Sequence, residues 1–335
     1  MLLLTDLTDR ELDPLELPPG GPNVKRRLKE SGSVLEEWLG AALSLPPETV
    51  SRQFADPWAT AWGALVVVDR ADGSQYDALL AASRRERPPR PVAAIALTGR
   101  GFHGNRGRPW QTVRGNLHLS CAVPLDLSAA RDARGLPALA AVAVCDALGA
   151  CAPALRPRIK WINDVLLGAG KVAGVLAAVQ SQGARLTGAT LGIGINVAVA
   201  PPVPPSVFVP RVTCLHDHAG GRGLPLGRVL GGLLSALTAR LMQLQDAGAG
   251  PLVDAYRARC DDVGEQVEVW PEGLPDASRR ADLPPPVAAG EVLALDDDLA
   301  LHVAGAPHPL HGGRLVYREH PLPPDHGPGG TGTPA

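Results

Sequence analysis

The sequence predicts an α+β protein that ends in a small antiparallel β-barrel, and three observations lead to this prediction. Short apolar runs typical of strands alternate with helical stretches between residues 64 and 260. From residue 262 onward the pattern changes to short strands separated by turns. Hydrophobic residues make up 45% of the 335 residues, which is enough to bury a core of this size.

The composition divides the chain into four segments. The start of the chain, residues 1–22, is acidic and proline-rich, so we expect it to be irregular. Residues 24–43 predict a helix, or a broken helical pair weakened by Gly32. The proline- and glycine-rich end of the chain predicts a disordered tail. The expected segments are an N-terminal extension (1–60), a large domain (61–260), a small C-terminal domain (261–320) and the tail (321–335).

The elements follow from apolar periodicity and from turn residues. Between the strands at 92–97 and 116–125 lies a stretch too rich in glycine and arginine to be either kind of element. The second of these strands alternates apolar and polar residues, which predicts one buried face. The expected strands are ALVVV (64–68), VAAIAL (92–97), NLHLSCAVPL (116–125), RIKWI (158–162), KVAGVLAAV (171–179) and ARLTGATLGIGINV (184–197), and the last two form a hairpin. The expected helices are 74–83, 136–150, 224–247 and 251–260.

Bulk properties exclude several classes of protein. The formal net charge of −2 provides no general attraction for nucleic acid or anionic membranes, and no helix-turn-helix with a basic second helix is found. No apolar run reaches the length needed to span a membrane, and acidic residues come too early for a signal peptide. Five scattered cysteines without a CxxC pair predict a reduced, cytoplasmic protein. The HDH at 216–218 favours a solvated loop over a metal site.

The stretch KWINDVLLGAGKVAGVL (160–176) contains two of the four lysines in the chain. Asn163 and Asp164 predict a turn, and the glycines at 168 and 170 predict a hairpin that brings Lys171 close to them. A lysine is a compact point charge with three rotatable donors, which suits a carboxylate that becomes an acyl phosphate. The alternative is an ordinary solvated hairpin lysine, although the rarity of lysine argues against it.

The stretch GRGFHGNRGRPW (99–110) combines four glycines with Arg100, Arg106 and Arg108. Glycine lets a backbone approach a ligand closely, and arginine binds phosphate or carboxylate through planar donors. The stretch is neither a Walker loop nor a dinucleotide fingerprint, because no helix follows it. An anion-binding loop and a flexible surface loop are equally compatible with these residues.

The stretch LGIGINV (191–197) predicts a central strand in which Gly192 and Gly194 weaken the packing unless another group must come close. Asn196 is a polar residue among apolar ones and needs a partner if it is buried. The alternative is an ordinary core strand that ends in a turn.

In order and spacing, these stretches resemble the motifs of the biotin protein ligase family, within the biotin/lipoate ligase superfamily. The resemblance covers roughly residues 64–320 and includes the small C-terminal domain. Five motifs lie in register, although each alone is weak. They are RGRPW (106–110), RGNLHLS (114–120), KWIND (160–164), KVAGVL (171–176) and GIGIN (192–196).

The resemblance implies a fold and an activity. The fold is a class II synthetase-like mixed sheet with helices on one side, plus an SH3-like barrel. The activity is conversion of biotin and Mg·ATP to biotinyl-adenylate, followed by transfer of biotin to a lysine of a biotin carboxyl-carrier domain. Magnesium would arrive with ATP and not in a protein cage. No DNA-binding head, nucleic acid or membrane partner is expected, and the chain should be a monomer or a weak homodimer.

The resemblance also assigns roles to residues of this chain. Lys171 would bridge the biotin carboxylate and the α-phosphate. Asn163 and Asp164 would order ATP and its metal together with Lys160, and Asp164 would orient the incoming lysine. The glycine-arginine loop would close over the adenylate, and Trp110 would pack near the adenine. The remaining expected binding residues are Gly73, Ser74, Gln75, Arg100, Gly101, Arg106, Gly107, Arg108, Gly174, Gly194 and Asn196.

Departures from the family pattern concentrate where biotin would be recognised. Gly73-Ser74-Gln75 stands where the family has Ser-Thr-Asn, and Ala96 stands where it has a glutamine. The loop is about three residues longer, and Asn105 replaces an arginine. Loss of a hydrogen-bonding partner reduces discrimination first. The leading hypothesis is therefore a biotin–protein ligase. The alternatives are an adenylating ligase for lipoate, octanoate or another small acid, and a non-catalytic binding protein on the same scaffold.

Overall fold

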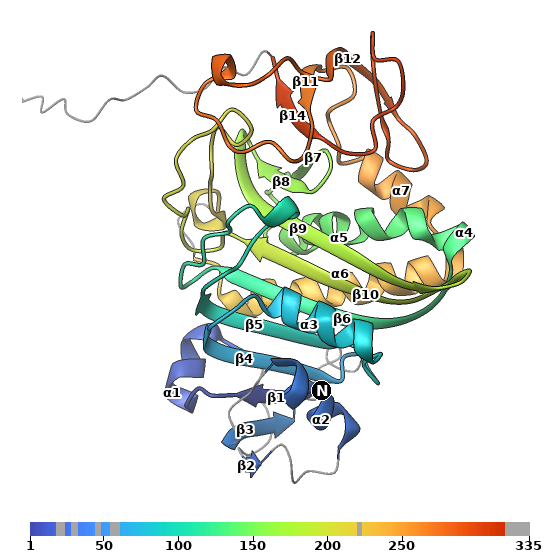
Figure 1. The fold of residues 1–335 in the computed structure, drawn as a ribbon. Helices are drawn as coiled ribbons and strands as arrows, with labels where there is room; N and C mark the ends of the chain where they lie inside the picture. Colours follow the sequence, from blue (N-terminus) through green and yellow to red (C-terminus); the bar gives the residue numbers. More distant parts are fainter. Residues whose placement is uncertain (18–23, 28–32, 44–47, 54–60, 220–222, 319–335) are drawn as a thin grey trace, which may run out of the picture.

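The computed structural model describes residues 1–17, 24–27, 33–43, 48–53, 61–219 and 223–318. In these ranges a ten-stranded mixed sheet forms the centre, and a four-stranded antiparallel sheet forms a small C-terminal domain beside it (Figure 1). The strand orders are β2-β3-β1-β4-β5-β6-β10-β9-β8-β7 and β13-β12-β11-β14. The α+β prediction with a small C-terminal β domain is confirmed.

The strands have the following bounds. In the large sheet they are β1 (Leu2–Thr5), β2 (Val24–Arg27), β3 (Glu48–Gln53), β4 (Ala64–Ala71), β5 (Val92–Gly99), β6 (Leu117–Ser128), β7 (Arg158–Lys160), β8 (Asp164–Leu167), β9 (Gly170–Gln182) and β10 (Arg185–Ile195). In the small sheet they are β11 (Gln266–Trp270), β12 (Ala288–Leu295), β13 (Leu301–Val303) and β14 (Arg314–Tyr317).

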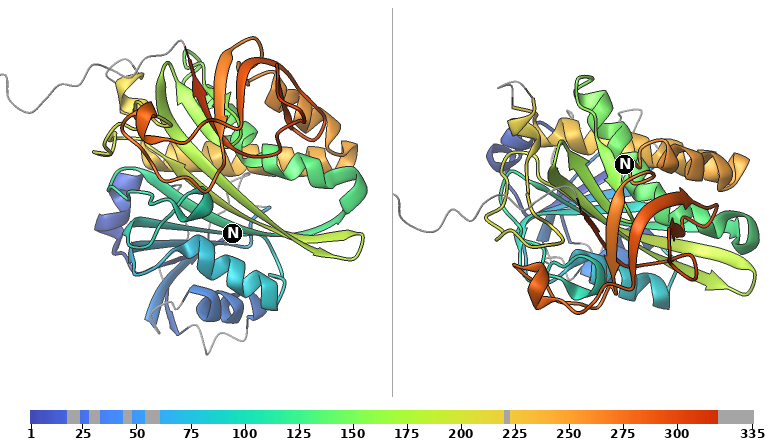
Figure 2. Two further views of the ribbon diagram at one scale, coloured as in Figure 1. Left: turned by 45° about the horizontal axis from the view of Figure 1, so that its top comes forward. Right: turned by 90° about the horizontal axis from the view of Figure 1, so that it is seen from above.

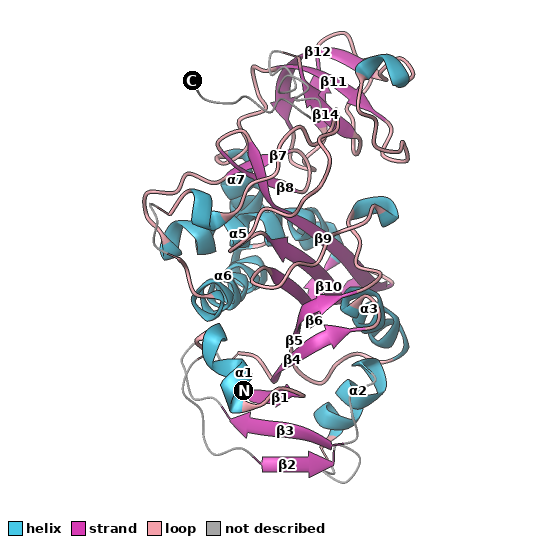
Figure 3. Ribbon diagram, turned by 90° about the vertical axis from the view of Figure 1, so that its left-hand side faces the viewer, coloured by secondary structure: helices cyan, strands magenta, loops and turns pink. Residues whose placement is uncertain are grey.

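The helices cover both faces of the large sheet. They are α1 (Asp9–Leu12), α2 (Val34–Leu43), α3 (Gln75–Arg85), α4 (Ala129–Asp132), α5 (Leu136–Cys151), α6 (Leu226–Ala247) and α7 (Gly250–Arg257). Along β4, Leu65 and Val67 belong to the core cluster beneath α5 and α6, whereas Val66 and Val68 belong to the cluster beneath α2 and α3. Figure 3 shows these two helix pairs on opposite sides of the strands. The expectation that helices cover only one side of the sheet is therefore wrong, because α2 and α3 cover the second side.

The N-terminal extension differs most from its prediction. Strand β1 pairs in parallel with β4, and β2 and β3 extend the sheet beyond it. Leu3 and Leu4 are buried, so the prediction that the first residues are irregular is wrong for β1 and for the helical turns that follow it. The predicted helix over 24–43 begins only at Val34, because Val24–Arg27 is a strand. Residues 18–23 and 28–32, which include the predicted break at Gly32, lie outside the described residues, as does the predicted tail.

Within the large domain most of the remaining elements follow the predictions. The predicted strand 158–162 ends at Lys160, however, and Asp164, which was expected in a turn, begins the unpredicted strand β8. Strands β9 and β10 form the expected hairpin, which projects from the sheet in both views of Figure 2. Strand β6 is buried on both faces over most of its length, so the prediction of one exposed face is wrong. In the part of the chain that the structure describes, one helical stretch, Ala129–Cys151, has the length and apolar composition of a membrane span. It is mostly buried inside the protein, as a core helix is.

Candidate active site

A cavity of about 150 Å³ lies on the α3 side of the sheet. Its floor is formed by β6, β9 and β10, and its roof is the loop of residues 100–110, which we call the arginine loop. A wall comes from the segment 201–212, and the small domain contributes Asp276 and Arg314. The cavity therefore draws on segments that are far apart in the sequence.

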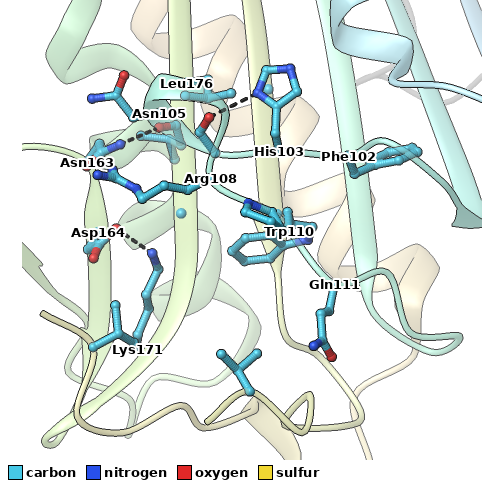
Figure 4. Close-up of a pocket in the computed structure, with 18 of the residues that line it drawn as sticks. Phe102, His103, Asn105, Arg108, Trp110, Gln111, Asn163, Asp164, Lys171 and Leu176 are labelled. Carbon is cyan, nitrogen blue, oxygen red and sulfur yellow. Dashed lines mark hydrogen bonds and ion pairs between the residues drawn. The ribbon is translucent and has the colours of Figure 1, made fainter. Parts of the chain in front are cut away.

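Lys171 lies at the centre of this site. Its Nζ is 2.7 Å from Oδ1 of Asp164 and 5.9 Å from the centre of the Trp110 ring (Figure 4). The backbone of Lys171 is fixed by hydrogen bonds with Arg211 and Thr213. Both charged side chains are only about one-fifth exposed, so the alternative of an ordinary solvated hairpin lysine does not hold.

Charge and burial act in opposite directions on Asp164. Burial raises the pKa of its carboxyl, but Lys171 and Lys160 lower it more, so the pKa lies below its usual value. Asp164 is therefore ionised at neutral pH and holds the ammonium of Lys171 in place. Asn163 fixes the preceding turn through two hydrogen bonds with Val175. Its side-chain Nδ2 donates to the Val175 carbonyl at 3.1 Å, and its backbone carbonyl accepts from Val175 N.

Lys160 does not line the cavity. Its side chain is buried and donates a hydrogen bond from Nζ to the Phe208 carbonyl at 2.8 Å. Burial lowers the pKa of Lys160 to about 8, against the opposing effects of Asp164 and Asp262. In this position Lys160 holds the wall segment and supplies positive charge beneath Asp164.

The glycines in the floor allow aromatic rings to lie against the sheet. A Cβ atom at Gly194 would be 2.3 Å from Cζ2 of Trp110, and one at Gly174 would be 3.3 Å from the same indole. A Cβ atom at Gly192 would be 3.0 Å from the Tyr76 ring. The prediction that another group must approach Gly192 and Gly194 is confirmed, and the approaching groups are these two rings.

Trp110 is fixed by His118 of β6. The indole Nε1 donates to His118 Nδ1 at 3.2 Å, and His118 Nε2 is 3.3 Å from the Val113 carbonyl. Burial lowers the pKa of His118 to about 4, so the ring is neutral at neutral pH. The neutral ring accepts from Trp110 through Nδ1, so the proton is on Nε2, which lies 3.2 Å from Val113 N and 3.3 Å from the Val113 carbonyl.

Asn196 is buried directly after the last residue of β10 and borders the cavity. Its Nδ2 donates to the Thr213 carbonyl at 3.0 Å, whereas its Oδ1 has no hydrogen-bond partner. A buried acceptor without a partner costs free energy, so this atom is available to a donor group of a ligand. The prediction that a buried Asn196 needs a partner therefore holds for one of its two polar atoms.

The other expected binding residues divide into two groups. Ser74 and Arg108 line the cavity, and Ser74 also caps α3 by accepting from Asp77 N at 3.2 Å. Another seven do not line it. They are Gly73, Gln75, Arg100, Gly101, Arg106, Gly107 and Lys160. Gln75 is buried with Oε1 unpaired, and the side chains of Arg100 and Arg106 are exposed.

Several residues that border the cavity were not among the expected site residues. They are Tyr76, Phe102, His103, Gln111, His118, Ser120, Asp276 and Arg314. The strand alternation could have found His118 and Ser120, because they lie opposite Gly194 and Gly192 in the β6–β10 register. No local signal marks Asp276 or Arg314, which belong to the small domain.

Three comparisons relate this chain to known proteins. The model of the biotin/lipoate A/B protein ligase family matches residues 79–196. A biotin–[acetyl-CoA-carboxylase] ligase of Paracoccus denitrificans is 35% identical over 59% of this chain and 81% of its own length. A ligase of the same name from Mycobacterium tuberculosis is 33% identical over 62% of this chain and 75% of its own length.

Among solved structures, the biotin protein ligase of Aquifex aeolicus in complex with biotin and ATP superposes with a TM-score of 0.57. The match covers 77% of this chain and 99% of that chain at 20% identity. This likeness concerns the fold alone.

Proposed function

Because this chain belongs to the biotin protein ligase family, we propose that it is an ATP-dependent biotin–protein ligase. It would activate biotin as biotinyl-5′-AMP and transfer the biotinyl group to a lysine of a biotin carboxyl-carrier domain. The observation that supports this most strongly is the Lys171–Asp164 pair, which lines the cavity next to Trp110.

In the first step an oxygen of the acid's carboxylate attacks the α-phosphorus of ATP, and the bond to pyrophosphate breaks. Two anions must approach each other, so a fixed positive charge between them lowers the barrier. Lys171 supplies this charge, and Asp164 keeps its ammonium in place. Arg108 and Trp110 in the roof exclude water from the mixed anhydride.

In the second step the amine of the acceptor lysine attacks the acyl carbon, and AMP leaves. Asp164 is the charged acceptor closest to Lys171 in the cavity and would orient the incoming amine. Asn196 Oδ1 would accept a hydrogen bond from the adenylate.

We expect magnesium to arrive with ATP, and Asn163 and Asp164, which line the cavity, would order the nucleotide and its metal. Among the described residues no group of three His, Cys, Asp or Glu is placed to hold a metal ion. The two carboxylates that line the cavity, Asp164 and Asp276, are paired with Lys171 and Arg314. When bound, magnesium neutralises phosphate charge.

One observation favours an acid other than biotin as the substrate. Ala96, where the family has a glutamine, is buried in the core cluster under α2 and α3 and does not line the cavity. Polar side chains near the head of the acid would instead be Ser74, His118 and Ser120. Lipoate, octanoate or another small carboxylate is therefore the alternative substrate.

The test is pyrophosphate release from ATP with biotin, lipoate and octanoate, combined with the intact mass of a carrier domain added to the reaction. Biotin-dependent release with a biotinylated carrier supports the proposal. Release with another acid alone supports the alternative, and no release with any acid supports a non-catalytic binding protein.

Three further expectations belong to this proposal. We expect the reaction in the cytoplasm, a monomer or weak homodimer, and no binding of nucleic acid. All five cysteines are free and buried, which agrees with a reducing compartment. Sedimentation velocity and an electrophoretic-shift assay at physiological salt test the other two.

A further inference from the structure

One residue of the small domain, Glu272, makes three hydrogen bonds with the arginine loop. Its Oε1 accepts from Asn105 Nδ2 at 3.2 Å, and its Oε2 accepts from Arg106 Nε at 2.7 Å. The backbone carbonyl of Glu272 also accepts from Arg108 at 3.5 Å. The Glu272 side chain is 19% exposed, so its carboxylate lies largely out of water. One residue thus contacts three members of the loop that roofs the cavity.

The same part of the small domain also contacts the wall of the cavity. We call residues 271–277, which follow β11, the strap. Ala277 at its end accepts a hydrogen bond from Val207 N at 2.8 Å. The Phe208 ring lies edge-on to Trp270 at 5.7 Å, and the Arg314 guanidinium lies 3.6 Å from the centre of the Phe208 ring. The strap therefore bridges the roof and the wall from outside the large domain.

The large domain by itself gives the tip of the loop fewer contacts. The base of the loop is closed by hydrogen bonds between Gly99 and Thr112, and its middle by Trp110 N to the Phe102 carbonyl. At the tip, Arg106 has a left-handed backbone (φ 55°) and a side chain that is 65% exposed. Glu272 is the charged partner of this side chain, and its contact fixes a conformation that a non-glycine residue rarely adopts.

We propose that Glu272 is a positioning residue that fixes the arginine loop over the cavity, so that Arg108 and Trp110 stay above Lys171. The expected effect on ATP and the adenylate rests on the proposed function, whereas the expected effect on the position of the loop does not. Without Glu272 the tip of the loop opens more often, and ATP and the adenylate leave more readily. The chemical step depends on Lys171 and Asp164, which do not contact Glu272, so it keeps its rate.

The first experiment needs no ligand. Hydrogen–deuterium exchange of the peptide that covers residues 102–111 is compared in the parent, Glu272→Ala and Glu272→Gln. We expect exchange to rise by about 3- to 10-fold in Glu272→Ala and less in Glu272→Gln, which retains one acceptor. The matched control is Asp282→Asn, because Asp282 also pairs with an arginine in the small domain but does not contact the loop. Unchanged exchange in Glu272→Ala overturns the proposal.

The second experiment measures the reaction. In Glu272→Ala we expect the KM for ATP to rise about 3- to 10-fold and more free adenylate to appear, with kcat within a factor of about two. A fall in kcat at unchanged KM overturns the proposal. If no acid supports turnover, the exchange result still decides the positioning role, so the two failures remain distinguishable. Arg106→Ala removes the same contact from the loop side. If Glu272→Ala misfolds, the exchange of the loop in Arg106→Ala, and not its kinetics, takes its place in the first experiment.

Discussion

The floor and the roof of the cavity are built differently. The floor consists of β6, β9 and β10, which are joined by continuous antiparallel ladders within the ten-stranded sheet. The roof is a loop whose position depends on individual side-chain contacts to α3, β6 and the small domain. The hydrogen bonds between the strands are many and form cooperatively, whereas the contacts of the roof are few and can break one at a time. The floor therefore presents Lys171 in a fixed geometry beside Asp164 of the adjoining strand β8, and the roof can open for ligands.

The largest effect is expected when the charge on the floor is removed. Lys171→Ala should lower the rate of adenylate formation by about 10²- to 10³-fold, because no other lysine among the described residues lines the cavity. Lys171→Arg should also lower it, since a planar guanidinium cannot reproduce the position of a compact ammonium. Pyrophosphate release measures the rate, and circular dichroism checks the fold. Either variant turning over at the parent rate would remove Lys171 from its assigned role.

The next effect is expected where roof and floor touch. A Cβ atom at Gly194 would clash with the Trp110 indole, so Gly194→Ala should displace the ring and destabilise the protein by about 1–3 kcal/mol. Thermal denaturation and tryptophan fluorescence report this change. Gly149→Ala is the control, because a Cβ atom at Gly149 meets no atom within 4 Å. Equal melting temperatures for the two variants would contradict the packing of Trp110 on Gly194.

The smallest effect concerns the contact of the roof with α3. His103 Nε2 lies 2.8 Å from Asp77 Oδ2, and Nδ1 lies 3.0 Å from the Gly104 carbonyl. Both contacts need a protonated nitrogen, and the Gly104 and Asp77 contacts raise the pKa of His103 above 6.5 against the effect of burial. The stabilisation is therefore complete below pH 6.5 and is lost as pH rises through the folded-state pKa.

The melting temperature tests this pH dependence. We expect the difference between the parent and His103→Asn to shrink from pH 6 to pH 9, with a total below about 1 kcal/mol because the pair is partly exposed. Asp77→Asn should reduce the same pH dependence. If the difference in melting temperature stays constant with pH, the charge on His103 does not contribute to its contact with Asp77.

Elements formed by local interactions could be predicted from the sequence, whereas elements formed by contacts between distant segments could not. The core strands β4 and β5 and the helices α3, α5 and α6 follow from local periodicity. Strand β1 was missed because its four residues become a strand only by pairing with β4, some sixty positions away. The apparent polar face of β6 is buried, because His118 and Ser120 line the cavity and are not in water.

The motifs of the site and the proximity of Lys171 to Asp164 follow from the order of residues along the chain, because a hairpin brings nearby positions together whatever surrounds it. Which residues reach the cavity depends instead on how the segments of the fold pack. This packing buries Lys160 beneath the wall, leaves Arg100 outside, and brings Glu272 to Arg106 across 166 residues. Contacts between distant segments depend on how whole layers pack, and no local pattern in the chain records that packing.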